Sequence, residues 1–420
     1  MKPSRRSDRP WLTPNVFYMG LVSLLSDASH EMATAILPFF LALDLGAGAG
    51  VLGLIEGASD GASSFVKSYA GYRSDRAGRR KPFMELGYSM TGIFKPMIAL
   101  ATAWPQVLLL RMSAWIGRGV RGPPRDALLA DSAEPTDVGK AFGFQRALDT
   151  AGAVLGPALA LFLVQFVSYR TIFVLSAIPG IAAVIVVFSK IREVDRPRTG
   201  AGETRNHRHN AGFIDSMKSL PKPFKKYLFA VGAFGMGNFA NSLFSLRAQQ
   251  VLAPVYGAGG ASAVAIALYV LLNLVYASAS FPVGALTDKI GRKGVLVTGY
   301  FISAATCLAT AFLVPDLVLL AVVFASAGLF TAITDTVEGT MAADFLQAKS
   351  RGTGFGVLQT VNGLGDFISS AVVGVLWTSF SPELAFAYAA ALSALGGLFL
   401  LRTPTRRGQA GAEAQQEPSI

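Results

Sequence analysis

A short basic loop between two long apolar segments occurs twice in this chain, and this repeat constrains the fold more than any other feature. The first copy, residues 71–81, reads Gly-Tyr-Arg-Ser-Asp-Arg-Ala-Gly-Arg-Arg-Lys. A basic turn that returns after half a chain predicts a duplicated membrane protein whose short loops share one side. The second copy lies 213 residues later (288 − 75), at Gly284, Asp288, Lys289, Gly291, Arg292 and Lys293.

The apolar segments are long and numerous enough for a multi-pass membrane protein. Of the 420 residues, 52% are hydrophobic and 15% are charged, a composition far too apolar for a soluble domain. A spanning helix needs roughly 20 mostly apolar residues. The sequence therefore predicts an all-α membrane protein with about twelve transmembrane helices in two pseudo-symmetric halves of six. The predicted spans are 14–43, 49–72, 82–103, 105–131, 139–166, 168–189, 224–254, 261–285, 294–314, 316–345, 352–379 and 382–402.

The distribution of basic residues predicts the orientation of these spans. Lys and Arg gather in one set of loops, whereas the alternate loops offer only Arg170. Because basic loops stay on the cytoplasmic side, we expect a cell inner membrane protein with both termini in the cytoplasm. We expect a six-helix half at 1–189, a polar cytoplasmic linker at 190–223, a second half at 224–405 and a disordered tail at 406–420.

Composition and spacing also argue against several other classes of protein. The net charge of +11 is typical of nucleic-acid binding, but the basic residues lie in short loops between apolar runs, so we expect no nucleic acid partner. The single Cys307 leaves no cysteine cluster for a metal. The sequence shows no nucleophile-and-base pair, phosphate loop or metal-ligand spacing. We therefore expect no enzyme activity, no cofactor and no bound metal, and a monomer surrounded by membrane lipids.

The offset of 213 residues extends well beyond the two loops. This continuity predicts two parallel six-helix halves related by an axis along the membrane normal, an arrangement found in secondary transporters. The matched positions include Asp131 and Asp344, Gly139 and Gly352, Gly143 and Gly356, Arg146 and Gln359, Asp149 and Asn362, and Gly152 and Gly365.

These features resemble the major facilitator superfamily, itself a standard example of such parallel repeats. The loop between the second and third helices of that family reads roughly Gly-x-x-x-Asp-Arg/Lys-x-Gly-Arg-Arg/Lys. Its positions are matched by Gly71, Asp75, Arg76, Gly78, Arg79 and Arg80, and again by the second copy. The resemblance covers nearly the whole chain and implies alternating access without ATP. It also implies that Asp75 contacts the start of span eleven at 351–354, and Asp288 the start of span five at 139–142.

A second motif resembles the fifth-helix signature of the proton-driven exporters of this family. Gly143, Gly152, Gly156 and Pro157 fit the signature, but its final glycine pair is replaced by Ala160 and Leu161. This partial match favours an antiporter. Glycines that only allow two helices to pack closely are the alternative explanation.

Acidic residues within the spans are the candidates for proton coupling. Asp27 and Glu31 are four residues apart and share a helix face, with His30 beside them, and Glu56 and Asp60 repeat this spacing. A buried ionisable group is costly unless it faces a cavity or a partner. We favour Asp27 as the proton site, with the other three acids as competitors. Permanent ion pairs with Arg111, Lys67 or Lys95 are the alternative, and His30 alone is more typical of a packing residue.

The two halves differ at these acidic positions. The residues 213 positions later are Ala240, Phe244, Tyr269 and Asn273, none of them acidic. We therefore expect proton coupling in the first half, and shape and apolar contact from the second. His30, Lys95 and Arg111 are predicted to line the substrate cavity, because Arg111 enters span four at the depth of the acids and Pro96 interrupts span three after Lys95.

The inner end of span four is predicted to act as a gate. Arg118, Arg121 and Arg125 lie there, and the matching part of span ten carries Asp335 and Glu338. We expect pairs between these two groups to hold the outward-open state, although a solvated basic helix end explains the arginines equally well. In span five, Arg146 and Asp149 are three residues apart and are expected to pair with each other or with the first-half loop.

Together these patterns predict a proton-coupled secondary transporter for a small molecule. Export of an organic, amphipathic or toxic compound in exchange for protons is the favoured function. Proton-coupled uptake of an anionic metabolite or metal chelate is the alternative, with Arg111 and Lys95 at the substrate. Export of a divalent metal is less favoured, because His30 is the only nitrogen ligand within the spans. A membrane sensor or a lipid-modifying enzyme on the same scaffold lacks an appended domain or a catalytic constellation.

Overall fold

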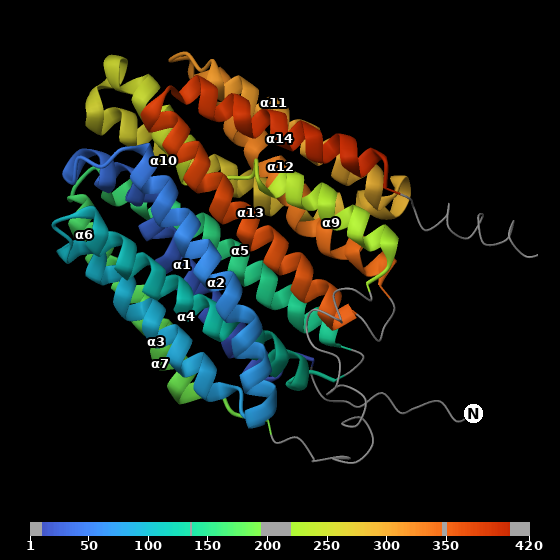
Figure 1. The fold of residues 1–420 in the computed structure, drawn as a ribbon. Helices are drawn as coiled ribbons and strands as arrows, with labels where there is room; N and C mark the ends of the chain where they lie inside the picture. The colour runs from blue at the N-terminus through green and yellow to red at the C-terminus, as the bar shows by residue number, and fades with distance from the viewer. Residues whose placement is uncertain (1–10, 135–136, 195–219, 347–350, 404–420) are drawn as a thin grey trace, which may run out of the picture.

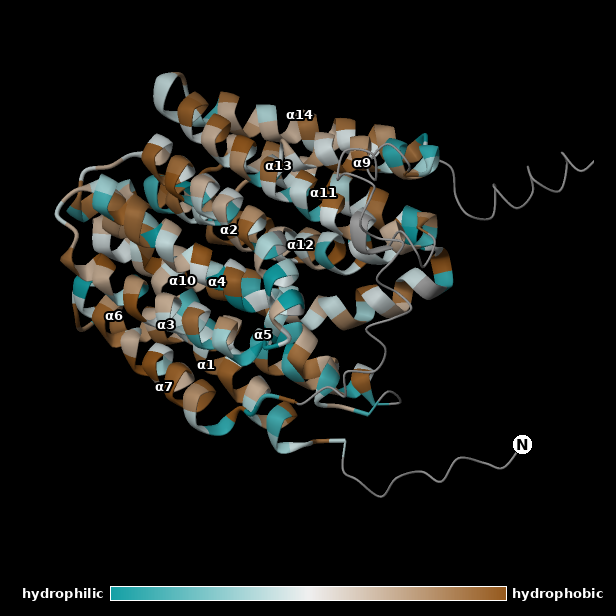
Figure 2. Ribbon diagram, turned by 60° about the horizontal axis from the view of Figure 1, so that its bottom comes forward, coloured by the Kyte–Doolittle hydropathy of each residue, from teal (hydrophilic) through white to brown (hydrophobic). Residues whose placement is uncertain are grey.

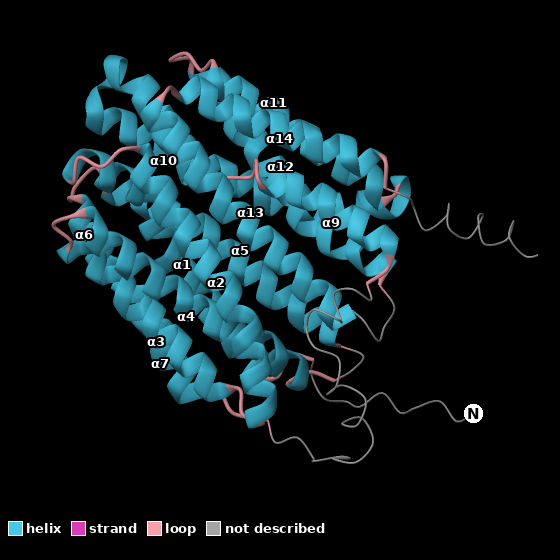
Figure 3. Cartoon of the chain, viewed as in Figure 1, coloured by secondary structure: helices cyan, strands magenta, loops and turns pink. Residues whose placement is uncertain are grey.

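The computed structural model describes residues 11–134, 137–194, 220–346 and 351–403, and these residues form helices, turns and loops without strands (Figure 3). The first half contains α1 (Pro14–Phe39) with a π-helical turn (Phe40–Asp44), α2 (Ala49–Ala77), α3 (Lys81–Met97) with a 3₁₀ turn (Ile98–Leu100), α4 (Trp104–Asp131), α5 (Val138–Leu163), α6 (Tyr169–Leu175) and α7 (Ala177–Lys190). The second half contains α9 (Lys222–Gly235), α10 (Ser242–Ile290), α11 (Arg292–Ala311), α12 (Leu317–Phe345), α13 (Arg351–Ser379) and α14 (Pro382–Leu401).

Two groups of roughly parallel and antiparallel helices make up the molecule. Figure 1 shows the blue-to-green helices of the first half on one side and the yellow-to-red helices of the second half on the other. The helices α6 and α7 together make one span, and α10 bends at Gly257, where φ is 69°, so that it contributes to two. The prediction of twelve helices in two halves is confirmed.

The seventh span departs from the sequence prediction. We expected a continuous helix over 224–254, but α9 ends at Gly235 and α10 begins at Ser242. The interruption contains Gly237, which lies so close to α14 that an added Cβ would come within 2.7 Å of the Ala389 carbonyl. Irregular backbone at membrane depth is tolerated where it lines a cavity. This interruption therefore identifies a wall of the internal cavity.

Polar residues are placed inside the bundle rather than against lipid. In Figure 2 the outer helices α7 and α14 are mostly brown and pale, whereas teal gathers near α4 and α5. Among the described residues, seven helices are long and apolar enough to cross a membrane, and α1 to α4 are not among them. The α3 helix is short, with 17 residues, and α1, α2 and α4 carry buried charges, including Glu56 and Arg111. Ionisable residues that face the interior of a membrane protein mark a functional site.

Each of the two signature loops turns at a glycine with a positive φ, at one end of the bundle that is called here the basic end. Gly78 ends α2 with a left-handed φ of 67°, and Gly291 has a φ of 91° between α10 and α11. Such values favour glycine, because it has no Cβ. The side chains of Asp75 and Asp288 are outside the described part of the structure, so their predicted contacts stay predictions. Most of the predicted linker and the whole predicted tail also lie outside the described residues.

An arginine follows each turn and forms an ion pair with an aspartate on the second helix after it. Arg80 pairs with Asp131 at the end of α4, and Arg292 pairs with Asp344 on α12 at 2.5 Å. The sequence offset aligns Arg292 with Arg79, so the first-half contact is made one residue later than the repeat predicts. Glu193, just after α7, also accepts hydrogen bonds from the backbone N–H groups of Arg80 and Lys81, an arrangement that suits a helix N-terminus.

Glycines bring helices into close contact both within and between the halves. Between the halves, a Cβ at Gly53 of α2 would lie 2.1 Å from the Ser370 carbonyl of α13. Within the first half, a Cβ at Gly152 of α5 would lie 2.4 Å from the Leu24 carbonyl of α1. Gly143, by contrast, has no neighbour within 4 Å of such an atom. The glycines of the exporter-like motif are therefore not equivalent: Gly152 is needed for packing and Gly143 is not.

The substitution Gly152→Val is expected to destabilise the protein by about 1–3 kcal/mol, because the added methyl groups force α1 and α5 apart. The thermal unfolding midpoint of the purified protein in detergent measures this effect. Gly143→Ala is the matched control on the same helix, and its midpoint should equal or exceed that of the unmodified protein. Equal losses at both positions would contradict this account of the motif.

Candidate functional site

A polar cavity of about 430 Å³ lies between the two halves. Its first wall consists of side chains from α1, α2 and α4, and its second wall of residues 238–242, α10, α12 and α13. The lining residues come from the middle turns of α2, α12 and α13, so the cavity lies at mid-depth of the bundle. Its volume is in the range of small-molecule sites.

The cavity is closed at one end and connected at the other. An apolar cluster formed by both halves covers it on the side away from the basic loops, with Phe40 and Leu52 from the first half and Ile266 and Trp377 from the second. On the opposite side a second cavity of about 630 Å³ shares Lys67, Arg118 and Gln359 with the first. The molecule is therefore in a state in which the central cavity is approached from the basic end.

A buried ion pair lies on the first-half wall. One Arg111 amino group, on α4, lies 3.0 Å from a Glu56 carboxylate oxygen on α2, and both side chains are at most 4% exposed. The same guanidinium donates to the Thr34 hydroxyl at 3.2 Å and lies 4.5 Å from the centre of the Trp115 ring. Glu56 is thus in an ion pair with Arg111, which was the alternative to a role in proton coupling. A buried charge that loses its partner is strongly destabilising.

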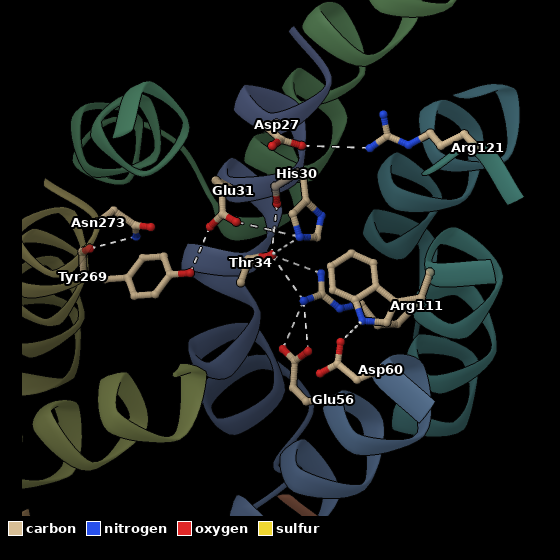
Figure 4. Close-up of polar contacts among 11 residues, drawn as sticks. Asp27, His30, Glu31, Thr34, Glu56, Asp60, Arg111, Arg121, Tyr269 and Asn273 are labelled. Atoms are coloured by element: carbon tan, nitrogen blue, oxygen red, sulfur yellow. Dashed lines mark hydrogen bonds and ion pairs between the residues drawn. The ribbon is translucent and has the colours of Figure 1, made fainter. Parts of the chain in front are cut away.

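Glu31 connects the two halves across the cavity (Figure 4). Its carboxylate accepts a hydrogen bond of 2.9 Å from the Tyr269 hydroxyl on α10. His30 Nε2 lies 3.8 Å from the other Glu31 oxygen and 3.5 Å from the Thr34 hydroxyl. Both Glu31 and His30 line the cavity. A titratable group that bonds directly to the opposite half is well placed to connect protonation with movement of the halves.

The remaining first-half candidates occupy different environments. Asp60 lines the cavity and accepts a hydrogen bond of 2.7 Å from the Trp115 indole nitrogen. Asp27 is buried one turn closer to the basic end, 3.9 Å from Arg121, and is not part of the cavity lining. Lys95 is 1% exposed on α3 and likewise lies outside the lining. The structure thus brings Glu31 and Asp60 to the cavity, and leaves Asp27 and Lys95 behind its first wall.

Acids also occur inside the second half, so the contrast between the halves from which we expected proton coupling in the first half is incomplete. Asp366 on α13 lines the cavity and accepts a hydrogen bond of 3.0 Å from the Asn238 side chain. Glu338 is 7% exposed and accepts bonds from the Tyr300 hydroxyl and the Asn362 amide. The comparison of equivalent positions missed Asp366, because it corresponds to Ala153, whereas Glu338 had been predicted only as a gate residue. A lone acid within the apolar run 352–379 was the available signal.

The second wall is also more polar than predicted. We expected apolar contact from this half, but the side chains of Asn238, Asn241 and Gln359 line the cavity together with Asp366. Two of these residues lie in the interruption between α9 and α10, which the hydrophobic pattern did not predict.

The arginines at the inner end of α4 are not paired with Asp335 or Glu338 in this state. Arg125 lies 2.9 Å from Asp126 and 3.8 Å from Asp149, and Arg118 lies 5.2 Å from the centre of the Trp115 ring. Because the basic end is the approachable one here, the expected gate pairs belong to the opposite state and stay a prediction.

A different polar contact joins the halves near the basic end. Arg146 on α5 lies 3.6 Å from Asp149. A pair between these two residues was one of the two contacts that we expected for them. Arg146 also donates a hydrogen bond of 3.0 Å to the Tyr276 hydroxyl on α10. That hydroxyl in turn donates to Asp335 at 3.0 Å. Tyr276 thus connects an arginine of the first half to an acid of the second.

Two helical halves around a polar cavity that is closed at one end define a multi-pass membrane transporter of the alternating-access type. The sequence profile of the Major Facilitator Superfamily matches residues 19–274 and 251–419. The chain belongs to this superfamily, whose members are transporters rather than enzymes.

Individual relatives agree with this assignment. An uncharacterised MFS-type transporter, MJ1317, of Methanocaldococcus jannaschii is 33% identical over 403 residues, which are 96% of this chain and 97% of the relative. The quinolone resistance protein NorA of Staphylococcus aureus is 26% identical over 164 residues, 39% of this chain and 42% of that protein.

Solved structures show the same fold at low sequence identity. A mutant of the nucleoside transporter NupG has a TM-score of 0.78 at 12% identity, covering 92% of this chain and 99% of that one. A D-xylose–proton symporter has a TM-score of 0.73 at 14% identity, covering 95% and 99%.

Proposed function

We propose that this protein is a proton-coupled secondary transporter that exports a small hydrophilic compound in exchange for protons. The observation that carries the proposal is the hydrogen bond between Glu31 of the first half and Tyr269 of the second, inside the cavity. When Glu31 is ionised, this bond is charge-assisted and favours the state that is closed at the apolar end. Protonation removes the charge, weakens the bond and shifts the equilibrium towards the other state.

The environments of the acids favour Glu31 as the coupling residue over its competitors. Glu56 is held by Arg111 at 3.0 Å, and Asp27 lies near Arg121 outside the cavity lining. Asp60 and Asp366 line the cavity and accept hydrogen bonds from neutral groups, so they are the second choices. Asp60 accepts its bond from Trp115 of its own half and Asp366 from Asn238 of its own half, whereas the bond of Glu31 crosses between the halves.

The proposed orientation places the basic end in the cytoplasm of an inner-membrane protein. Support comes from the basic residues of both signature loops and of the linker, since such loops stay cytoplasmic. In this orientation the structure corresponds to an inward-facing state. We retain the division into halves at 1–189 and 224–405, the linker at 190–223 and the tail at 406–420.

Export is favoured over import by two partial likenesses. The Gly143, Gly152, Gly156 and Pro157 pattern resembles the exporter signature, and the partial match to NorA is to a quinolone resistance protein. The polar lining of the cavity favours a hydrophilic compound over an amphipathic one. Proton-coupled uptake of an anionic metabolite is the second candidate, supported by the Lys67, Arg111 and Arg118 side chains in the lining.

Proton movement in everted membrane vesicles distinguishes the two directions. A ligand identified by thermal shift is added outside energised vesicles, and the internal pH is followed with a fluorescent dye. Exchange predicts that the vesicle interior becomes more alkaline, whereas symport predicts acidification. The absence of any flux in the presence of a confirmed ligand would contradict both candidates.

The proposed gate at the inner end of α4 predicts a charge-swap rescue. Reversing the charge of Arg125 alone, or of Asp335 alone, should reduce transport about tenfold or more, because like charges then meet when the basic end closes. Combining Arg125→Glu with Asp335→Arg should restore most of the lost rate. A double variant no better than the worse single variant would remove this pair from the gate, and the same swap with Arg118 or Arg121 then tests the others.

A further inference from the structure

Polar and charged side chains dominate both walls of the central cavity. Apart from Trp115 and Tyr269, whose polar atoms already form hydrogen bonds, the apolar side chains in the lining are those of Phe239 and Ala240. Ser242, in the same lining, is 4% exposed, and its hydroxyl has no hydrogen-bond partner among the described residues. A buried polar group of this kind needs a partner, because leaving it unpaired costs free energy. The cavity is therefore built for a ligand that forms hydrogen bonds.

Cations on the first wall are left without an acidic partner. Lys67 on α2 and Arg118 on α4 both line the cavity, and neither forms an ion pair within 4 Å in the described part of the chain. Arg111, in contrast, is already neutralised by Glu56. Two of the three cations on this wall thus remain free to bind an anionic group.

Acids on the second wall are left without a cationic partner. Asp366 accepts a hydrogen bond from the neutral Asn238, and Asp335 accepts one from the neutral Tyr276 hydroxyl. Neither acid has a cation within 4 Å among the residues that the structure describes. The described lining of this wall contains no Lys or Arg. This wall therefore offers negative charge alone, whereas the first wall carries Lys67 and Arg118 beside the acids Glu31 and Asp60.

We propose that the transported compound is a small hydrophilic zwitterion, an inference that rests on the proposed function. Its anionic group binds between Lys67 and Arg118 on the first wall, and its cationic group binds at Asp366 on the second. The amides of Asn241 and Gln359 line the same space and can bind hydroxyl or carbonyl groups between the two ends. A ligand that contacts both halves at once also stabilises the closed intermediate of an alternating-access cycle.

Ligand binding to the purified full-length protein in detergent tests this assignment. The probes are amino acids and dipeptides, each beside its N-acetyl derivative, which lacks the cation, and its methyl ester, which lacks the anion. Citrate and tetraphenylphosphonium represent anionic and lipophilic ligands. We expect zwitterions to give the largest increases in melting temperature, with at least about tenfold weaker binding of the singly charged derivatives.

Two variants locate the charges. Asp366→Asn should remove the preference for a zwitterion over its N-acetyl derivative, and Lys67→Gln with Arg118→Gln should remove the preference over its ester. Glu383→Gln, which changes an acid on α14 that pairs with Arg247 outside the lining, is the matched control. If Asp366→Asn does not fold, Asp335→Asn serves as the second variant.

Several results would overturn the assignment. The first is that citrate or tetraphenylphosphonium gives the largest increase in melting temperature, and the second is that no zwitterion in the panel gives any increase. The third is that the variants keep the preference of the unmodified protein for zwitterions over their singly charged derivatives. Binding in detergent requires no proton gradient, so failure of proton coupling leaves this test intact. Conversely, a lipophilic cation that binds best and still drives proton exchange would contradict the zwitterion and leave the proposed coupling to protons standing.

Discussion

Arg111→Met is expected to lower the free energy of unfolding by about 3–5 kcal/mol, because it leaves the Glu56 carboxylate buried without its counterion. The two side chains are 1% and 4% exposed and lie 3.0 Å apart, so the carboxylate is largely desolvated when it loses its partner. Reversible unfolding of the purified protein in mixed micelles measures the loss. This is the largest stability effect that we expect from a single substitution in the cavity wall.

The double variant Arg111→Met with Glu56→Gln is the control for this prediction. Removing both charges should recover most of the lost stability, since a buried ion pair contributes little compared with a neutral pair of similar size. Additive losses in the double variant would show that Arg111 stabilises the fold through Thr34 or Trp115 and not through Glu56.

Glu31→Gln is expected to abolish proton-driven accumulation of substrate while preserving exchange of substrate across the membrane. One proton moving down a potential of about 100 mV supplies about 2.3 kcal/mol, enough for a gradient of about 50-fold. Proteoliposomes with the variant should therefore fall from a gradient of this order to simple equilibration. Counterflow of labelled substrate, which requires no net proton movement, should continue.

Matched variants separate a coupling role from a packing role at Glu31. Tyr269→Phe keeps the ring and removes the hydroxyl that bonds to Glu31, so coupling should weaken while Glu31 stays titratable. Asp44→Asn, an exposed acid at the apolar end, should behave like the unmodified protein. Full accumulation by Glu31→Gln would move the coupling site to Asp60 or Asp366.

The sequence predicted the overall architecture well because its strongest signals are local. The turns at Gly78 and Gly291 have positive φ values, which glycine adopts easily. A basic loop between two apolar runs favours the cytoplasmic side of a bilayer, so the sequence also predicts its orientation. The helix contacts near Gly152 likewise follow from a small residue at a fixed spacing. These features depend on residues close together in the chain.

The cavity was harder to predict because its contacts join distant segments. Tyr269 attracted notice only as the counterpart of Glu56 in the repeat, yet it bonds to Glu31, 238 residues away. The interruption at 236–241 lies inside a span predicted from its hydrophobicity, and its Gly237, Asn238 and Asn241 are poor helix formers that do not by themselves show where a helix ends. Asp366 has no acidic counterpart in the first half, so a comparison of the halves alone passed over it.

The distance between the two halves at the apolar end, measured by pulsed electron paramagnetic resonance, tests most directly whether Glu31 controls their movement. Spin labels at Thr102 and Pro315, in a Cys307→Ser background, occupy exposed and equivalent loops of the first and second halves. The Glu31–Tyr269 bond predicts that acidification lengthens this distance, and that Glu31→Gln has the longer distance at every pH. A distance that ignores pH, or that still changes with pH in Glu31→Gln, would contradict it.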